Sequence, residues 1–230
     1  MTVRKLKTSL LLPAGLLAFL LGAPAAASAS EIATPLQAKT PFSLKAGSPP
    51  LKRKLWGSTY LGNPLRLLVL KDQTVDGTRY LKLRLPERPN NSFAWVREDH
   101  VYLSTSPARI VIDVSERRVT LFWDGDKKWS ERVVVGAPGT PTPTGQFAIY
   151  ERYRTNTDLR PWVFELTAHS ETLRSYNGGP GRVAMHGRHG ALAAAMWGTA
   201  GSHGCIRMPD KALHRIAKQA PMGSPVRVRR

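Results

Sequence analysis

Residues 202–208 read Ser-His-Gly-Cys-Ile-Arg-Met and include Cys205, the single cysteine of the 230-residue chain. A cysteine attacks a carbonyl group as its thiolate, so it needs a nearby base and hydrogen-bond donors for the oxyanion that forms. His203 precedes the thiol by two residues, and Gly204 between them allows a substrate to approach the backbone closely. A second imidazole, His186, ends a short apolar strand upstream. The pattern therefore predicts a thiol nucleophile with a histidine base.

The two motifs together resemble the L,D-transpeptidase family with its YkuD-type catalytic domain. That family carries His-Gly, a gap of similar length, and then Ser/Thr-His-Gly-Cys followed by an apolar residue and Asn or Arg. His186-Gly187 and residues 202–207 satisfy this pattern, and a Pro/Thr/Gly loop at 137–145 extends the resemblance upstream. The resemblance implies a mainly β fold, with a β-sandwich-like catalytic domain at 107–230 that contains one or two short helices.

The resemblance also implies a role for each motif residue. Cys205 is the nucleophile that forms a thioester, and His186 is the base that takes its proton. His203 supports the loop or orients the thiol, and the backbone N–H groups of Gly204 and Cys205 form the oxyanion hole. Further substrate contacts are expected from Ser202, Arg207 and Gly187. One branch of the family has serine after the first histidine, so here a backbone carbonyl is expected to orient His186 instead.

The reaction that this resemblance implies is acylation of the cysteine by a peptidoglycan stem tetrapeptide. Transfer of the acyl group to an amine then gives a 3-3 cross-link in cell-wall biogenesis and remodelling. Water in place of the amine gives a trimmed peptide, and the sequence leaves the balance between these outcomes open. Neither a cofactor nor a metal is expected, and the expected partners are peptidoglycan stem peptides rather than nucleic acid.

Two other functions fit parts of the same pattern. His186, His189, His203 and Cys205 include spacings that zinc accepts, which suggests a zinc hydrolase. The sequence nearby has no glutamate base of the His-Glu-x-x-His kind, which argues against this alternative. A wall-binding module that kept the fold and lost the chemistry is the second alternative, and the intact cysteine and histidine argue against it.

The first 29 residues have the pattern of a secretory signal peptide. Three cations occur within the first seven residues, an apolar run covers 10–21, and Ala27-Ser28-Ala29 fits a small-x-small cleavage site. The alternative is a membrane anchor, but the run is shorter than the roughly 20 apolar residues of a spanning helix. We therefore expect an exported protein of the cell envelope, in the cell wall or periplasm, without a stable membrane span after cleavage.

The formal net charge is +18, and the cations are scattered along the chain. In an exported protein this charge favours anionic wall polymers as partners, although it is also explained by solubility alone. Residues 30–54 are rich in Pro, Ala, Ser and Lys and predict a flexible linker. Residues 55–104 contain short strands and an Asp76-Gly77 turn, and they resemble a small SH3-like β-barrel. Such a module is expected to bring the enzyme to the wall, and the alternative is a β extension of the next domain.

Overall fold

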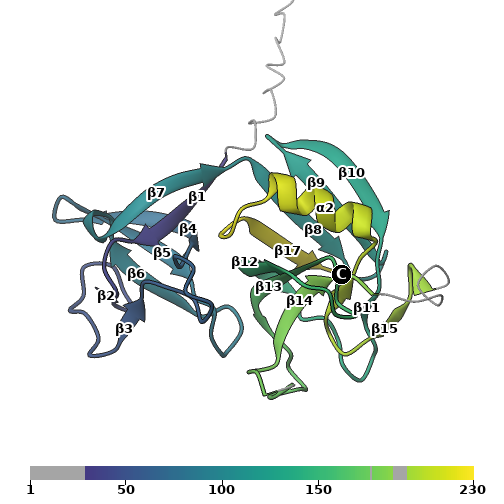
Figure 1. The fold of residues 1–230 in the computed structure, drawn as a ribbon. Coiled ribbons are helices and arrows are strands. Elements are labelled where there is room, and N and C mark those ends of the chain that lie inside the picture. Colours follow the sequence, from purple (N-terminus) through teal and green to yellow (C-terminus); the bar gives the residue numbers. More distant parts are fainter. Residues whose placement is uncertain (1–28, 177, 189–195) are drawn as a thin grey trace, which may run out of the picture.

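The computed structural model describes residues 29–176, 178–188 and 196–230, which form two β-sheet units (Figure 1). The predicted signal peptide at 1–29 lies outside the described residues except for its last position. Within the described ranges, the structure has no helix with the length and apolar character needed to cross a membrane.

We call residues 30–106 the N-terminal unit and residues 107–230 the C-terminal unit. The elements of the N-terminal unit are β1 (Ser30–Pro35), β2 (Lys39–Pro41), β3 (Lys54–Trp56), β4 (Leu67–Val75), β5 (Thr78–Arg84), β6 (Phe93–Arg97), the 3-10 helix η1 (Glu98–His100) and β7 (Val101–Ser106). Those of the C-terminal unit are β8 (Ala108–Asp113), β9 (Arg118–Trp123), β10 (Asp126–Arg132), β11 (Val135–Gly136), β12 (Gly145–Arg154), β13 (Trp162–His169), β14 (Arg182–His186), β15 (Ala200–Ser202), β16 (Ile206–Arg207), α2 (Asp210–Gln219) and β17 (Pro225–Arg229).

The N-terminal unit is a five-stranded antiparallel sheet in the order β6-β5-β4-β1-β7, accompanied by a β2-β3 pair. Leu81 and Leu83 of β5 are fully buried, while Lys82 between them is partly exposed, as the period of a half-buried strand requires. Asp76 and Gly77 join β4 to β5 with φ values of 48° and 74°, which confirms the predicted turn.

The structure corrects the flexible linker expected over 30–54, because this segment contains strand β1. Strand β1 pairs with both β4 and β7, so it is an inner strand of the sheet. Its buried residues are Ile32, Ala33 and Pro35. Three buried positions within one six-residue strand, one of them a proline, are too few to show a strand period in the sequence. The N-terminal unit therefore begins at Ser30, and its SH3-like character stays a prediction.

The C-terminal unit is built on an eight-stranded sheet in the order β10-β9-β8-β17-β12-β13-β14-β16. Most neighbours are antiparallel, but β17 pairs in parallel with β8, and β14 pairs in parallel with β16. The sheet and helix α2 enclose one core, in which Ile110, Phe147, Phe164 and Leu213 are fully buried. The prediction of a mainly β fold is confirmed.

Helix α2 follows strand β16 after two residues and buries one face in this core. Pro209 is its N-cap and Asp210 is its first helical residue. Leu213 and Ile216 are fully buried, and Asp210 places a negative charge in the first turn, where the helix dipole favours it. The helix therefore anchors the strand that directly follows the predicted nucleophile.

Specific contacts join the two units. Tyr150 of β12 packs into the core of the N-terminal unit, and the buried hydroxyls of Ser106 and Ser224 lie 2.9 Å apart. The Asn90 side chain donates to the His169 carbonyl and accepts the His169 N–H, both at 2.8 Å. These contacts support the view that the N-terminal unit stabilises the C-terminal unit. The attachment of the N-terminal unit to wall polymers stays a prediction.

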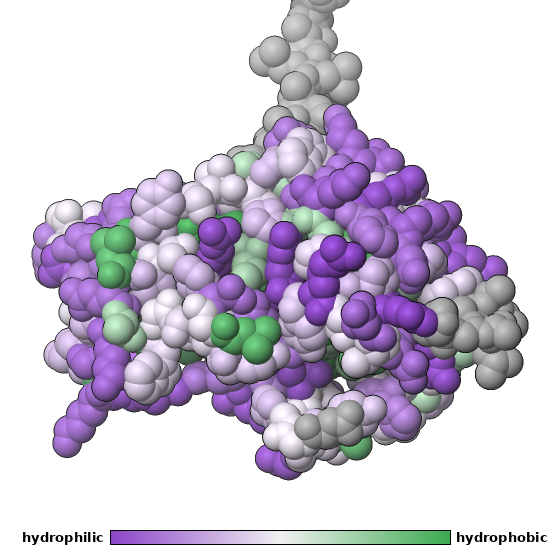
Figure 2. Space-filling view, viewed as in Figure 1, coloured by the Kyte–Doolittle hydropathy of each residue, from purple (hydrophilic) through white to green (hydrophobic). Residues whose placement is uncertain are grey.

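The face seen in Figure 2 is mostly hydrophilic, with hydrophobic residues in small separate spots.

Candidate active site

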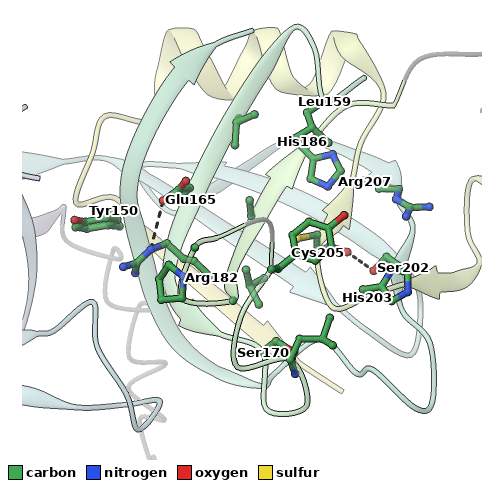
Figure 3. A pocket seen from close by; sticks show the side chains of 18 of the residues that line it. Tyr150, Leu159, Glu165, Ser170, Arg182, His186, Ser202, His203, Cys205 and Arg207 are labelled. Atoms are coloured by element: carbon green, nitrogen blue, oxygen red, sulfur yellow. Dashed lines mark hydrogen bonds and ion pairs between the residues drawn. The ribbon is translucent and has the colours of Figure 1, made fainter. Parts of the chain in front are cut away.

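A parallel strand pair brings together two motifs that are far apart in the sequence. Strand β14 ends at His186, strand β16 starts directly after Cys205, and the pairing places His186 opposite Arg207. The Met208 N–H donates to the His186 carbonyl at 2.8 Å and extends the pairing. The predicted base and nucleophile therefore line the same cavity (Figure 3).

The His186 imidazole is buried and oriented by one backbone carbonyl. Its Nδ1 atom lies 2.6 Å from the Gly187 carbonyl oxygen. A carbonyl oxygen can only accept, so Nδ1 carries the proton and Nε2 remains as the acceptor. Burial lowers the pKa of His186 to about 4, although the hydrogen bond to Gly187 opposes this shift. The ring is therefore neutral at pH 7 and able to take a proton.

Gly187 is required by the space available to it. A Cβ at this position would collide with the carbonyl oxygen of Arg160, which explains why no serine side chain occurs after His186. The Gly187 N–H donates to the Leu159 carbonyl at 3.1 Å. Gly187 is not among the residues that line the cavity, so in this structure it acts on the site through its contact with His186.

Burial raises the pKa of the Cys205 thiol. A hydrogen bond from the Ala184 backbone and the nearby charge of Arg207 lower this pKa, whereas the negative charge of Glu165 raises it further. Burial has the largest effect, so the resting Cys205 thiol is protonated. The free site thus holds a neutral thiol and a neutral imidazole, and the thiolate forms only as the proton moves to a base.

Replacement of Arg207 by methionine should raise the pKa of Cys205 further, because the lost cation favours the thiolate. The pH dependence of iodoacetamide alkylation should then shift to higher pH. Arg188→Met is the matched control, since Arg188 lines the same cavity but is not among the groups that shift the pKa of the thiol. Equal shifts in both variants would contradict a specific effect of Arg207.

Ser202 holds the turn that precedes the nucleophile. Its hydroxyl donates to the Cys205 carbonyl at 2.5 Å and accepts the Gly204 N–H at 3.2 Å. Gly204 has a φ of 105°, which residues with a side chain rarely adopt. The Gly204 N–H, which the family resemblance assigns to the oxyanion hole, is thus bonded to Ser202 in this structure. His203 is exposed and lines the cavity with Ser202 and Cys205.

The Pro/Thr/Gly loop at 137–145 fixes this turn through two threonine hydroxyls. Thr140 Oγ1 donates to the Ser202 carbonyl at 2.9 Å, and Thr142 Oγ1 donates to the Gly204 carbonyl at 3.0 Å. The buried Thr142 hydroxyl also accepts a backbone N–H of strand β11 at 2.8 Å. The loop therefore holds the backbone of the two residues Ser202 and Gly204 that lead to Cys205.

The cavity has a volume of about 860 Å³ and extends well beyond the predicted residues. Figure 3 shows Tyr150, Glu165 and Arg182 to the left of Cys205, with His186 above it and Arg207 to its right. Glu165 Oε2 lies 3.4 Å from Arg182 Nε, and both side chains are largely buried. This pair was not predicted from the sequence. The available signal was an acidic residue inside the mainly apolar strand β13, because charged side chains are rarely buried without a partner.

The zinc alternative rests on four residues, of which the structure describes three. His186, His203 and Cys205 line the cavity, whereas His189 lies outside the described residues. Within 29–176, 178–188 and 196–230, no group of three or more His, Cys, Asp or Glu side chains could hold a metal ion.

The fold and the cavity thus define a mainly β domain with a buried histidine and a cysteine at one site. The family model for the L,D-transpeptidase catalytic domain (YkuD) matches residues 107–228, and the chain belongs to this family. Members of this family are transpeptidases that cross-link peptidoglycan. No curated protein matches the chain.

Solved structures of L,D-transpeptidases are similar to this chain at low sequence identity. One from Mycobacterium smegmatis is 15% identical with a TM-score of 0.43, and the match covers 72% of this chain and 91% of that one. One from Mycobacterium tuberculosis H37Rv is 15% identical with a TM-score of 0.45, covering 72% and 90% of the two chains. One from Stackebrandtia nassauensis is 18% identical with a TM-score of 0.40, covering 55% and 57%. The family assignment rests on the match over residues 107–228.

Proposed function

We propose that this protein is an exported L,D-transpeptidase that links peptidoglycan stem peptides through a thioester on Cys205. The observation that supports the proposal is the parallel β14-β16 pair, which has a neutral buried imidazole and a partly buried thiol beside one cavity. Histidine and cysteine in such an arrangement supply the base and nucleophile of acyl transfer. The signal-peptide pattern at 1–29 supports a site of action in the cell envelope.

In the first half-reaction, Cys205 Sγ attacks the scissile carbonyl carbon of a stem tetrapeptide while its proton moves to His186 Nε2. The Cys205 N–H stabilises the oxyanion, and the Gly204 N–H joins it after leaving the Ser202 hydroxyl. The imidazolium then gives its proton to the leaving amine as the C–N bond breaks. His203 borders the thiol in this cavity and orients it. The products are a thioester and the released terminal amino acid.

In the second half-reaction, the amine of an acceptor stem peptide attacks the thioester carbonyl. His186 takes the proton of this amine and returns it to the sulfur as the C–S bond breaks. An amide cross-link forms and the free thiol is restored. Water can replace the amine in this step, and the product is then a shortened peptide, as in an L,D-carboxypeptidase.

Incubation of the mature protein with a defined tetrapeptide donor and an amine acceptor should yield a cross-linked dimer and the released terminal amino acid, both detectable by mass spectrometry. When the amines of donor and acceptor are both acetylated, the shortened peptide alone should form, because only water can then open the thioester to a new product. Recovery of unchanged tetrapeptide in both reactions, from a folded protein, would show that the proposed function is wrong.

A further inference from the structure

The loop between β3 and β4 carries the N-terminal unit to the C-terminal sheet. Its Thr59 hydroxyl and its Asn63 amide both donate to the carboxylate of Glu151 on β12, the amide at 2.9 Å. Glu151 is fully buried, and a buried carboxylate needs such donors. The loop also closes on itself, since the Thr59 N–H donates to the Asn63 carbonyl at 2.8 Å. It is therefore fixed on either side of Tyr60.

Tyr60 lies between these two anchors and reaches the catalytic cavity. Its hydroxyl donates to Glu165 Oε1 at 2.7 Å, and its ring stacks near that of Tyr150 with centroids 6.4 Å apart. Despite these contacts, 61% of Tyr60 is exposed. Among the described residues that line the cavity, Tyr60 belongs to the N-terminal unit and the others to the C-terminal unit. An exposed aromatic ring held in a fixed position is a ready surface for a ligand.

A chain of contacts links this ring to the surroundings of the nucleophile. Glu165 pairs with Arg182, whose guanidinium lies 4.2 Å from the centroid of the Tyr150 ring. The charge of Glu165 in turn acts on the Cys205 thiol. Figure 3 shows Glu165, Arg182 and Tyr150 on the side of Cys205 opposite Arg207. A peptide bound at the thiol can therefore extend from Cys205 along this side toward Tyr60.

We propose that Tyr60 is a substrate-binding residue, through which the N-terminal unit holds the peptide that acylates Cys205. This inference rests on the proposed function and adds a specificity role for the N-terminal unit. The acyl donor binds before the acceptor, to the free enzyme. The Tyr60 ring is exposed in the free enzyme and is therefore open to the donor. The ring covers apolar parts of the bound donor, while its hydroxyl keeps it in place against Glu165.

The test compares two reactions of the full mature protein. Acylation by a stem tetrapeptide is monitored by intact mass, and alkylation by iodoacetamide reports on the thiol without needing a peptide subsite. Tyr60→Ala should lower the second-order rate of peptide acylation by about tenfold or more, through weaker donor binding, since it removes the aromatic surface that the bound donor would cover. Its alkylation rate should stay as in the wild type. Tyr60→Phe keeps the ring and should retain most of the acylation rate.

Tyr102→Ala is the matched control, because Tyr102 is a tyrosine of the same unit that is 63% exposed and does not line the cavity. It should acylate at the wild-type rate. Equal acylation by the wild type and Tyr60→Ala would overturn the inference and leave the proposed function standing. A parallel loss of acylation and alkylation in both Tyr60 variants would also overturn it, since that result indicates a general structural effect. Failure of the wild type to acylate would instead disprove the proposed function.

Discussion

Replacement of Cys205 by alanine should abolish both the acyl-enzyme and the cross-linked product, because the described site offers the thiol of Cys205 as its nucleophile. Intact-mass measurement with a tetrapeptide donor or a carbapenem should show an adduct on the wild type and none on the variant. The rate of product formation should fall to the uncatalysed background. The fold should persist, since removal of one sulfur atom from a partly buried site costs only about 1 kcal/mol.

Cys205→Ser is the control for shape, because it keeps the size of the side chain and replaces the thiol by a weaker nucleophile. We expect it to fold and to form little or no adduct. A chelator should leave the wild-type rate unchanged, whereas the zinc alternative requires inhibition. Adduct formation on Cys205→Ala with the wild-type yield would place the nucleophile elsewhere in the chain.

The sequence was sufficient for the parts of the fold that depend on neighbouring residues. The Asp76-Gly77 turn needs residues that tolerate positive φ, and helix α2 shows its apolar face at the helical period. The segment Ser202–Cys205 was recognised by its resemblance to a family motif, and the positive φ of Gly204 is seen only in the structure. The physical cause of such local patterns lies in residues that are close together in the sequence.

Non-local contacts account for what could not be predicted. Strand β1 has two fully buried apolar residues, and it is an inner strand because β4 and β7 pair with it from elsewhere in the chain. The pairing of β14 with β16 sets the distance between base and nucleophile, and no spacing rule in the sequence specifies it. Tyr60 reaches the cavity because Glu151, 91 positions later, accepts hydrogen bonds from its loop. Single residues that meet across such separations leave no period to detect.

The site also shows why a motif is an incomplete description of reactivity. The motif names a cysteine and a histidine, whereas burial decides that both are neutral in the free enzyme. Arg207 and Glu165 act on the thiol with opposite signs, and only Arg207 belongs to the motif. The electrostatic balance at Cys205 therefore depends on strand β13 as much as on the segment that contains the nucleophile.

Removal of the base should have the second-largest effect. His186→Ala should slow alkylation and acylation near neutral pH by about 10²–10⁴-fold, the usual contribution of a positioned general base. The rate of the variant should recover partly at high pH, where the thiol ionises unaided. His203→Ala is the comparison variant. It removes a second histidine of the same cavity, which is proposed to orient the thiol, and it leaves His186 in place.

The pH profile separates this role from a structural one. Burial lowers the pKa of His186 to about 4, so the imidazole is neutral above that pH and protonated below it. A proton acceptor works only in its neutral form. The acylation rate of the wild type should therefore fall as the pH drops through about 4, rather than through the ordinary histidine pKa near 6.5. His203→Ala should keep this acidic limb, and His186→Ala should lose it. If His203→Ala removes the limb and His186→Ala retains it, His203 is the base and the assignment of His186 is wrong.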